Sequence, residues 1–256
     1  MIEEEVETKR GSLRKGVYIL PNLITTGGLF AGFYGIIASI QGSFHIAAWF
    51  VLISAVFDAL DGKVARMTGT TSRFGVEYDS LSDLVAFGVA PGILMYSWAL
   101  EPFGRFGWLA AFLYVVCGAL RLARFNVQAS TVESRNFIGL PIPAAACTVA
   151  SCVLLFYYLG GSGTIRMVSV VILIYVLAFL MVSNITYYSF KDPALFKRRP
   201  FWNLVLAVFI ILIVVARPEV MIFILCLIYT LFTPVLAGLA QLRRYRKAKT
   251  KGEAKV

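Results

Sequence analysis

The stretch DALDGKVARMTGTTSRFGVEYDSLSD, residues 58–83, decides how the rest of this chain is arranged. Its four aspartates stand in a sequence with only 14 acidic residues among 256. Asp58 and Asp61 are three residues apart, a spacing that places both on one face of a helix. Asp79 and Asp83, four residues apart, share a helix face in the same way. Two helices meeting with these faces together would gather four carboxylates, which predicts a site for divalent cations.

The composition around this stretch is that of a membrane protein. Of the 256 residues, 59% are hydrophobic and only 15% are charged. A soluble domain of this size cannot bury so much apolar surface, so we expect an all-α fold, a polytopic bundle of membrane helices. The single histidine, His45, excludes a histidine-rich zinc site, and the four cysteines show no metal-binding spacing.

The basic residues test the number of membrane spans. The apolar runs predict eight spans, at residues 18–40, 44–66, 77–100, 106–126, 138–159, 165–188, 201–216 and 219–241. With eight spans both termini share one side, and of the 24 lysines and arginines only Arg105, Arg166 and Arg217 lie on the other. The positive-inside rule then places both termini and residues 58–83 on the cytoplasmic side of the cell membrane.

Helix length predicts the depth of the four aspartates. Residues 44–57 are largely apolar and give about 21 Å of helix, which is short of the roughly 30 Å hydrocarbon core. Asp58 and Asp61 should therefore lie at the cytoplasmic boundary, facing a water-filled cavity. The next apolar run begins at Leu84, directly after Asp83, so the second pair lies at the same depth. This is the level of lipid headgroups.

The residue types at this level predict phosphoryl chemistry on a lipid. Four close carboxylates repel one another, and two divalent cations would balance their charge. Oxygen ligands favour Mg²⁺ or Mn²⁺, with Ca²⁺ as an alternative, and a metal pair suits displacement at phosphorus. Gly62 and Gly75 let a bulky group approach the backbone, and Arg66 offers a forked donor for a phosphate.

The same stretch resembles the CDP-alcohol phosphatidyltransferase family. Its pattern DxxDGxxARx₈GxxxDxxxD is matched at Asp58, Asp61, Gly62, Ala65, Arg66, Gly75, Asp79 and Asp83. Further segments are similar to the phosphatidylserine synthase branch, namely LPNLIT, SRFGVEYDSLSD, FGVAP, RLARFN and FIGLPIPAAA. The resemblance implies transfer of the phosphatidyl group of CDP-diacylglycerol, or of a CDP-archaeol type lipid, to L-serine with release of CMP. It also implies a homodimer.

The resemblance assigns roles by position within this pattern. It implies that Asp58, Asp61 and Asp79 bind metal, and that Asp83 is both a ligand and the general base. Asp79 is also expected to be catalytic. The nucleotide and its pyrophosphate would then meet four further positions, Gly62, Ala65, Gly75 and Arg66.

The serine would need partners outside the metal ligands. Arg121 and Arg124 in RLARFN are our candidates for its carboxylate, because this segment reaches the same interface. Both could equally be positive-inside anchors. Glu77 is a candidate for the ammonium group, and Asn22, near the cytoplasmic end of the first span, is a further candidate for headgroup binding.

The chain divides into four parts on this interpretation. Residues 1–17 form a cytoplasmic tail or interfacial helix, and residues 18–188 form a six-helix catalytic core. Residues 189–242 add two spans, and residues 243–256 are a basic tail that would anchor to anionic membrane lipid. This tail lacks a base-reading context, so no nucleic-acid partner is expected.

Three alternatives remain at this point. The same reaction could use inositol phosphate or glycerol phosphate, whose extra phosphate would need a more basic pocket. An ion or metal transporter could use the same carboxylates, although no acid marks a path across the later spans apart from Glu219 near an end. The third alternative, a purely structural scaffold, leaves the cost of the buried acids unexplained.

Overall fold

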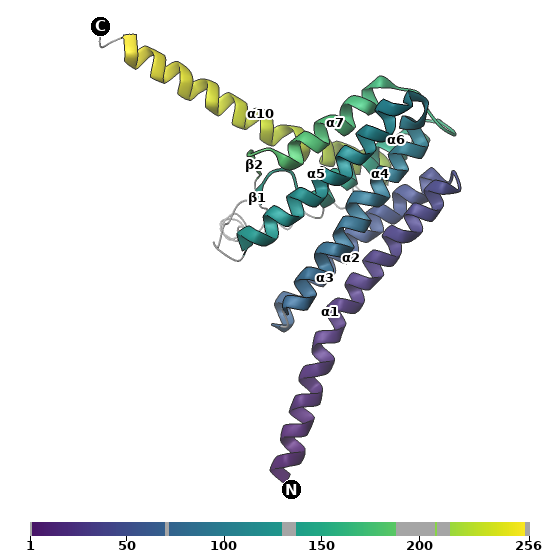
Figure 1. Cartoon of the computed structure of the whole chain (residues 1–256), viewed down its shortest axis with the longest axis vertical. Coiled ribbons are helices and arrows are strands. Elements are labelled where there is room, and N and C mark those ends of the chain that lie inside the picture. The colour runs from purple at the N-terminus through teal and green to yellow at the C-terminus, as the bar shows by residue number, and fades with distance from the viewer. Residues whose placement is uncertain (1, 70–71, 130–136, 188–207, 209–215, 254–256) are drawn as a thin grey trace.

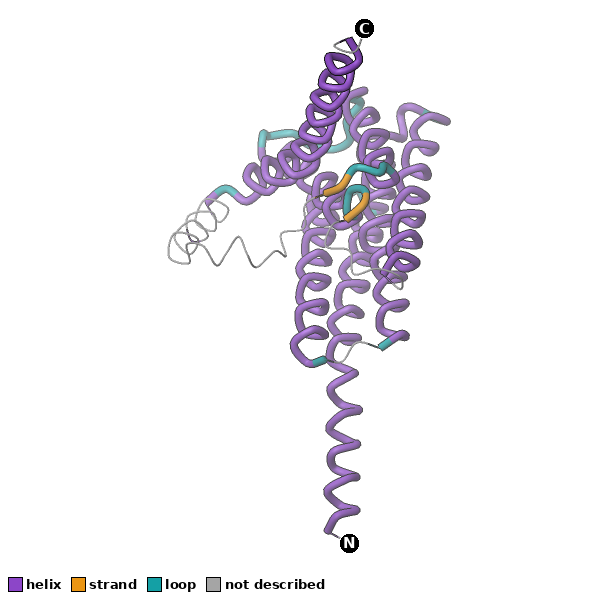
Figure 2. Tube along the Cα trace, turned by 90° about the vertical axis from the view of Figure 1, so that its left-hand side faces the viewer, coloured by secondary structure: helices purple, strands orange, loops and turns teal. Residues whose placement is uncertain are grey.

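The computed structural model describes residues 2–69, 72–129, 137–187, 208 and 216–253. The first half of the chain forms α1 (Ile2–Ile40), α2 (Phe44–Thr68), α3 (Arg73–Asp83), α4 (Ala90–Met95) and α5 (Arg105–Ala129). The second half contributes α6 (Ile142–Tyr158), α7 (Val168–Val182) and α10 (Pro218–Glu253). These helices pack side by side, while the N-terminal part of α1 and the C-terminal part of α10 extend beyond the bundle (Figures 1 and 2).

The described helices confirm an all-α, multi-pass architecture. Segments long and apolar enough to cross a membrane are Leu20–Ile40, Phe44–Thr68, Arg73–Phe103, Arg105–Gln128 and Pro218–Val235. The helices α6 and α7 are apolar but shorter. The predicted span at residues 201–216 falls almost wholly outside the described residues, so the number of eight spans stays a prediction.

The third of these segments is wound in an unusual way. Between α3 and α4 lies a π-helix, η1 (Leu84–Val89), and a second π-helix, η2 (Tyr96–Leu100), leads into the short 3₁₀ helix η3 (Glu101–Phe103). In η1 the carbonyl oxygen of Phe87 accepts a hydrogen bond of 3.1 Å from the hydroxyl of Tyr114, a fully buried residue of α5. Because η1 begins directly after Asp83, this wider winding adjoins the second acidic pair.

The helix α1 packs closely against residues that flank the acidic stretch on both sides. A Cβ atom at Gly32 would lie 2.7 Å from Cα of Ala86 in η1, and one at Gly28 would lie 3.3 Å from Cβ of Phe57 in α2. Small residues of α1 therefore allow close packing against its neighbouring helices. The hydroxyl of Ser54 on α2 also donates to the carbonyl oxygen of Gly28 at 2.8 Å.

A small pair of strands joins the start of α6 to the end of α7. The two-residue strands β1 (Phe137–Ile138) and β2 (Thr186–Tyr187) pair antiparallel. Directly after β1, Gly139 has a φ of +82°, and a Cβ there would lie 2.3 Å from the carbonyl oxygen of Met181. The segment FIGLP therefore needs glycine at this position, where the chain passes tightly beside the end of α7.

Candidate active site

Local signals end α2 and begin α3 so that the two acidic pairs face each other. Gly69 ends α2 in the left-handed conformation, with φ of +62°, and its N–H donates to the carbonyl oxygen of Ala65. Ser72 caps the start of α3, and its hydroxyl accepts a hydrogen bond of 2.9 Å from the N–H of Gly75. The chain therefore turns back on itself between the pairs, which lie on neighbouring helices.

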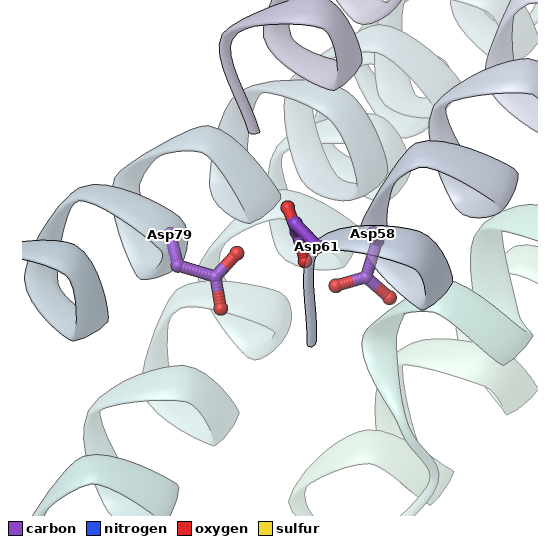
Figure 3. A group of neighbouring side chains, drawn as sticks. All are labelled: Asp58, Asp61 and Asp79. Carbon is purple, nitrogen blue, oxygen red and sulfur yellow. The ribbon is translucent and has the colours of Figure 1, made fainter. Parts of the chain in front are cut away.

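The aspartates of α2 and α3 come together at this point. Asp58, Asp61 and Asp79 each offer a carboxylate oxygen, and these oxygens all lie within 4.8 Å of one another (Figure 3). Asp61 is buried, and the other two are half-buried. Asp83 interacts electrostatically with the other three aspartates. The structure thus gathers both acidic pairs in one place.

The acidic group lines a pocket of about 180 Å³ between three helical segments. Its walls come from α1, α2 and the α3–η1 segment. The lining residues are Thr25, Gly28, Ser54, Asp58, Asp61, Asp79, Ser82, Asp83, Ala86 and Phe87. Three hydroxyls thus accompany the carboxylates, and sequence reasoning did not assign them to the site. In the sequence, such residues could have been recognised as serines or threonines on the side of an apolar helix that faces the aspartates.

The chemistry of these donors fits a hard divalent cation. Within the cluster every candidate ligand atom is a carboxylate oxygen, the type that Mg²⁺, Mn²⁺ and Ca²⁺ prefer. Carboxylates this close repel one another when ionised, and a divalent cation would relieve that repulsion. The residues therefore fit the metal dependence that is general in the family identified below.

The predicted nucleotide contacts surround this cluster along α2 and α3. A Cβ at Gly62 would meet nothing within 4 Å, so the backbone beside Asp61 is open. Ala65 is half-buried, and Arg66 is exposed in the last turn of α2. A Cβ at Gly75 would lie 3.3 Å from Oδ1 of Asn22 on α1.

The serine candidates differ in where they point. Arg121 is buried, with 7% of its surface exposed, and it interacts electrostatically with Asp83 and Asp58. Arg124 instead donates to the carbonyl oxygens of Val182 and Ser183, at the end of α7.

None of the four serine candidates is among the residues that line the pocket. The guanidinium of Arg124 also donates to Oδ1 of Asn184, at 2.5 Å, so Arg124 is hydrogen-bonded to three successive residues at the end of α7. Glu77 is exposed on α3, and Asn22 lies against Gly75 at the start of that helix. The roles of Arg124, Glu77 and Asn22 in serine binding therefore stay predictions.

Membrane-length helices that bring aspartates together in a pocket define a multi-pass membrane protein with a site suited to hard cations. The match to known sequences makes this more specific. The chain belongs to the CDP-alcohol phosphatidyltransferase family, whose sequence model matches residues 18–182. The matched region contains the whole acidic stretch and runs from α1 to the end of α7.

Curated relatives cover most of the chain. A CDP-diacylglycerol–serine O-phosphatidyltransferase of Helicobacter pylori is 42% identical over 208 residues, which is 79% of this chain and 84% of the relative. A protein of the same name in Bacillus subtilis is 38% identical over 68% of this chain and 93% of the relative. An archaetidylserine synthase of Methanothermobacter thermautotrophicus is 43% identical over 66% of this chain and 69% of the relative.

Proposed function

We propose that this chain is a membrane enzyme that transfers the phosphatidyl group of CDP-diacylglycerol to the hydroxyl of L-serine, giving phosphatidylserine and CMP. The observation that carries the proposal is the convergence of the family's aspartates on one pocket. The three relatives described above all bear names that include serine. Since one of them is named for archaetidylserine, a CDP-archaeol type lipid is the alternative donor.

Asp58, Asp61, Asp79 and Asp83 would hold two divalent cations, Mg²⁺ or Mn²⁺. Bound there, the cations would neutralise charge on the pyrophosphate and stabilise the attacking and leaving oxygens. The convergence of three carboxylate oxygens within 4.8 Å and the position of Asp83 in the same pocket support this assignment. Ca²⁺ is a weaker candidate, because its larger shell needs six to eight oxygen ligands.

Asp83 is the proposed general base. The hydroxyl of serine is a very weak acid, so a base must take its proton as the oxygen attacks phosphorus. A phosphorus–oxygen bond to serine forms, the phosphorus–oxygen bond to CMP breaks, and CMP leaves with the electron pair. Asp79, one helical turn earlier on α3, would orient the same phosphate through the metal centre.

The nucleotide would lie over the end of α2. The pocket that the four aspartates line would take the reacting phosphate and the metal ions. The open backbone at Gly62 and the exposed guanidinium of Arg66 support a nucleotide position beside the pocket. Ala65 and Gly75 would complete this surface.

Arg121 is the cation that we assign to the serine carboxylate. Its charge interacts electrostatically with that of Asp83, the proposed base, and its buried position would exclude water from a salt bridge to the serine carboxylate. An acceptor that carries its own phosphate, such as inositol phosphate or glycerol phosphate, would need more positive charge. The single assigned arginine therefore favours serine.

The remaining proposals concern the membrane. The distribution of basic residues supports eight spans, cytoplasmic termini and a cytoplasmic active site in the cell membrane. The match of the family model to residues 18–182 supports a catalytic core at residues 18–188, followed by two further spans and the basic tail. A homodimer, which the family resemblance implies, is the last part of this proposal.

Purified protein in detergent, supplied with CDP-diacylglycerol and Mn²⁺ or Mg²⁺, tests this function through CMP release. We expect release that depends on L-serine and is absent with inositol phosphate or glycerol phosphate. The Asp83→Asn variant, matched in size and lacking the base, controls for CMP release by contaminants. A folded, metal-loaded protein that releases no CMP with serine would contradict the proposed acceptor.

A further inference from the structure

A hydroxyl on α1 touches the acidic cluster directly. Oγ1 of Thr25 lies 2.8 Å from Oδ2 of Asp61 and 3.0 Å from the carbonyl oxygen of Pro21. Thr25 is buried, with 6% of its surface exposed, and so is Asp61, with 5%. This short, buried contact joins α1, which has no acidic residue within Leu20–Ile40, to the most buried of the three clustered aspartates.

The single proton of the Thr25 hydroxyl goes to the aspartate. A hydroxyl has one proton to donate, so only one of its two neighbours can receive it. A hydrogen bond to a charged carboxylate is about twice as strong as one between neutral groups, and the contact to Asp61 is also the shorter of the two. The Pro21 carbonyl, one turn earlier in α1, is the weaker acceptor.

Thr25 is bonded to both acidic helices. Its side chain holds Asp61 of α2, and its backbone carbonyl oxygen accepts a hydrogen bond of 3.3 Å from the hydroxyl of Ser82 on α3. Ser82 directly precedes Asp83. Thr25 therefore links the first acidic pair to the second. A displacement of Thr25 would change the positions of both pairs.

The contact also limits how Asp61 can turn. Repulsion from Asp58 and Asp79 favours rotations that carry the Asp61 oxygens away from the cluster. A hydrogen bond to Oδ2 opposes such rotation. Partners of this kind, which orient a metal ligand without touching the metal, change metal affinity by about 10- to 100-fold.

We propose that Thr25 is a positioning residue of the metal centre, whose hydroxyl holds Asp61 in the orientation that binds a divalent cation with Asp58 and Asp79. This proposal rests on the proposed function, because it needs the cation site at the acidic cluster. It adds a residue of α1 to a site whose ligands all come from α2 and α3.

Mn²⁺ binding to the purified full-length protein, measured from the free-ion electron paramagnetic resonance signal, tests the proposal without turnover. Thr25→Val keeps the shape of the side chain and removes the hydroxyl, and we expect its Mn²⁺ dissociation constant to rise about 10-fold or more. Thr25→Ser restores the hydroxyl and should bind close to wild type. Thr26→Val is the matched control, because the Thr26 hydroxyl meets that of Tyr78 at 2.9 Å and no carboxylate.

Unchanged Mn²⁺ affinity in Thr25→Val would overturn the proposal, as would an equal loss in Thr26→Val. If Thr25→Val does not fold, Thr25→Ala removes the same hydroxyl with a smaller side chain and is judged in the same way. A wild-type protein that binds no Mn²⁺ would overturn the metal centre itself. If only the proposal about Thr25 is wrong, the wild-type protein still binds Mn²⁺ and still releases CMP with serine. The failure of this proposal and that of the proposed function are therefore distinguishable.

Discussion

The contact between Gly32 of α1 and Ala86 of η1 sets how closely the first helix approaches the acidic pocket. A Cβ at Gly32 would lie 2.7 Å from Cα and 2.8 Å from Cβ of Ala86, whereas ordinary contacts are 3.4–4 Å. Gly32→Ala therefore requires the two helices to separate by about 0.7 Å, the difference between 3.4 and 2.7 Å. The neighbour is backbone, so no side-chain rotation relieves the clash.

Gly35→Ala is the matched control on the same helix. There the nearest neighbour of the added Cβ is the carbonyl oxygen of Ala47 at 3.4 Å, an ordinary contact. Both variants gain the same roughly 1 kcal/mol of helix propensity. The difference between their free energies of unfolding therefore isolates the overpacking at Gly32, which should cost about 1–3 kcal/mol. For a chain of this size that difference corresponds to a thermal midpoint lower by at least about 2 °C in Gly32→Ala than in Gly35→Ala.

The same shift should reduce turnover. Ala86 and Asp83 both line the acidic pocket, so separating η1 from α1 displaces the proposed base relative to the aspartates of α2. A misplacement of about 1 Å can cost about 100-fold in rate, and we expect a loss approaching that in serine-dependent CMP release. Thermal unfolding in detergent and CMP release are measured on both variants. Equal midpoints and equal rates for Gly32→Ala and Gly35→Ala would refute the close approach of the two helices.

Four further predictions concern the site and its frame. Asp83→Asn should lower serine-dependent turnover about 100- to 10,000-fold while thermal unfolding shows a folded protein; retained turnover would exclude it as the base. Arg121→Lys should raise the KM for serine more than that for CDP-diacylglycerol, because lysine cannot form a forked contact with the serine carboxylate. A larger rise of the serine KM in Arg124→Lys would assign carboxylate binding to Arg124 instead. Removal of metal with EDTA should abolish CMP release, and added Mn²⁺ or Mg²⁺ should restore it, whereas activity that survives exhaustive EDTA treatment would contradict the metal centre. Tyr114→Phe leaves the Phe87 carbonyl without its buried donor and should destabilise the fold by about 1–3 kcal/mol, seen as a lower thermal midpoint; an unchanged midpoint would show that the bond contributes little.

The acidic cluster could be predicted from the sequence because its information is local. Spacings of three and four residues fix which aspartates share a helix face, and Gly69 and Ser72 mark the turn between the helices. Apolar length and charge predict membrane spans without knowledge of their neighbours, and the number of eight spans stays a prediction. The structure agrees on the convergence of Asp58, Asp61 and Asp79, while their roles as ligands stay a prediction.

Other features could not be predicted, because they depend on contacts between distant parts of the chain. The sequence offered Arg121 and Arg124 as equivalent candidates, three residues apart on one helix. In the structure Arg124 donates to the end of α7, which lies nearly 60 residues away in the chain, whereas buried Arg121 interacts electrostatically with Asp83. The π-helix after Asp83 also makes a contact with a distant part of the chain, because its Phe87 carbonyl oxygen accepts a hydrogen bond from Tyr114 of α5.

The part played by α1 follows from the electrostatics of the site. Within Leu20–Ile40 this helix has no acidic residue, yet it bonds to α2 through Ser54 and to α3 through Ser82. Before a cation binds, repulsion between the aspartates pushes α2 and α3 apart, and bonds to a common third helix oppose that separation. A pocket held together in this way loses less conformational freedom when a cation enters, so more of the binding energy remains for affinity. Close packing at Gly32 and the hydroxyl of Thr25 thus act together: they preorganise a strongly charged site from a helical segment, Leu20–Ile40, that carries no charge.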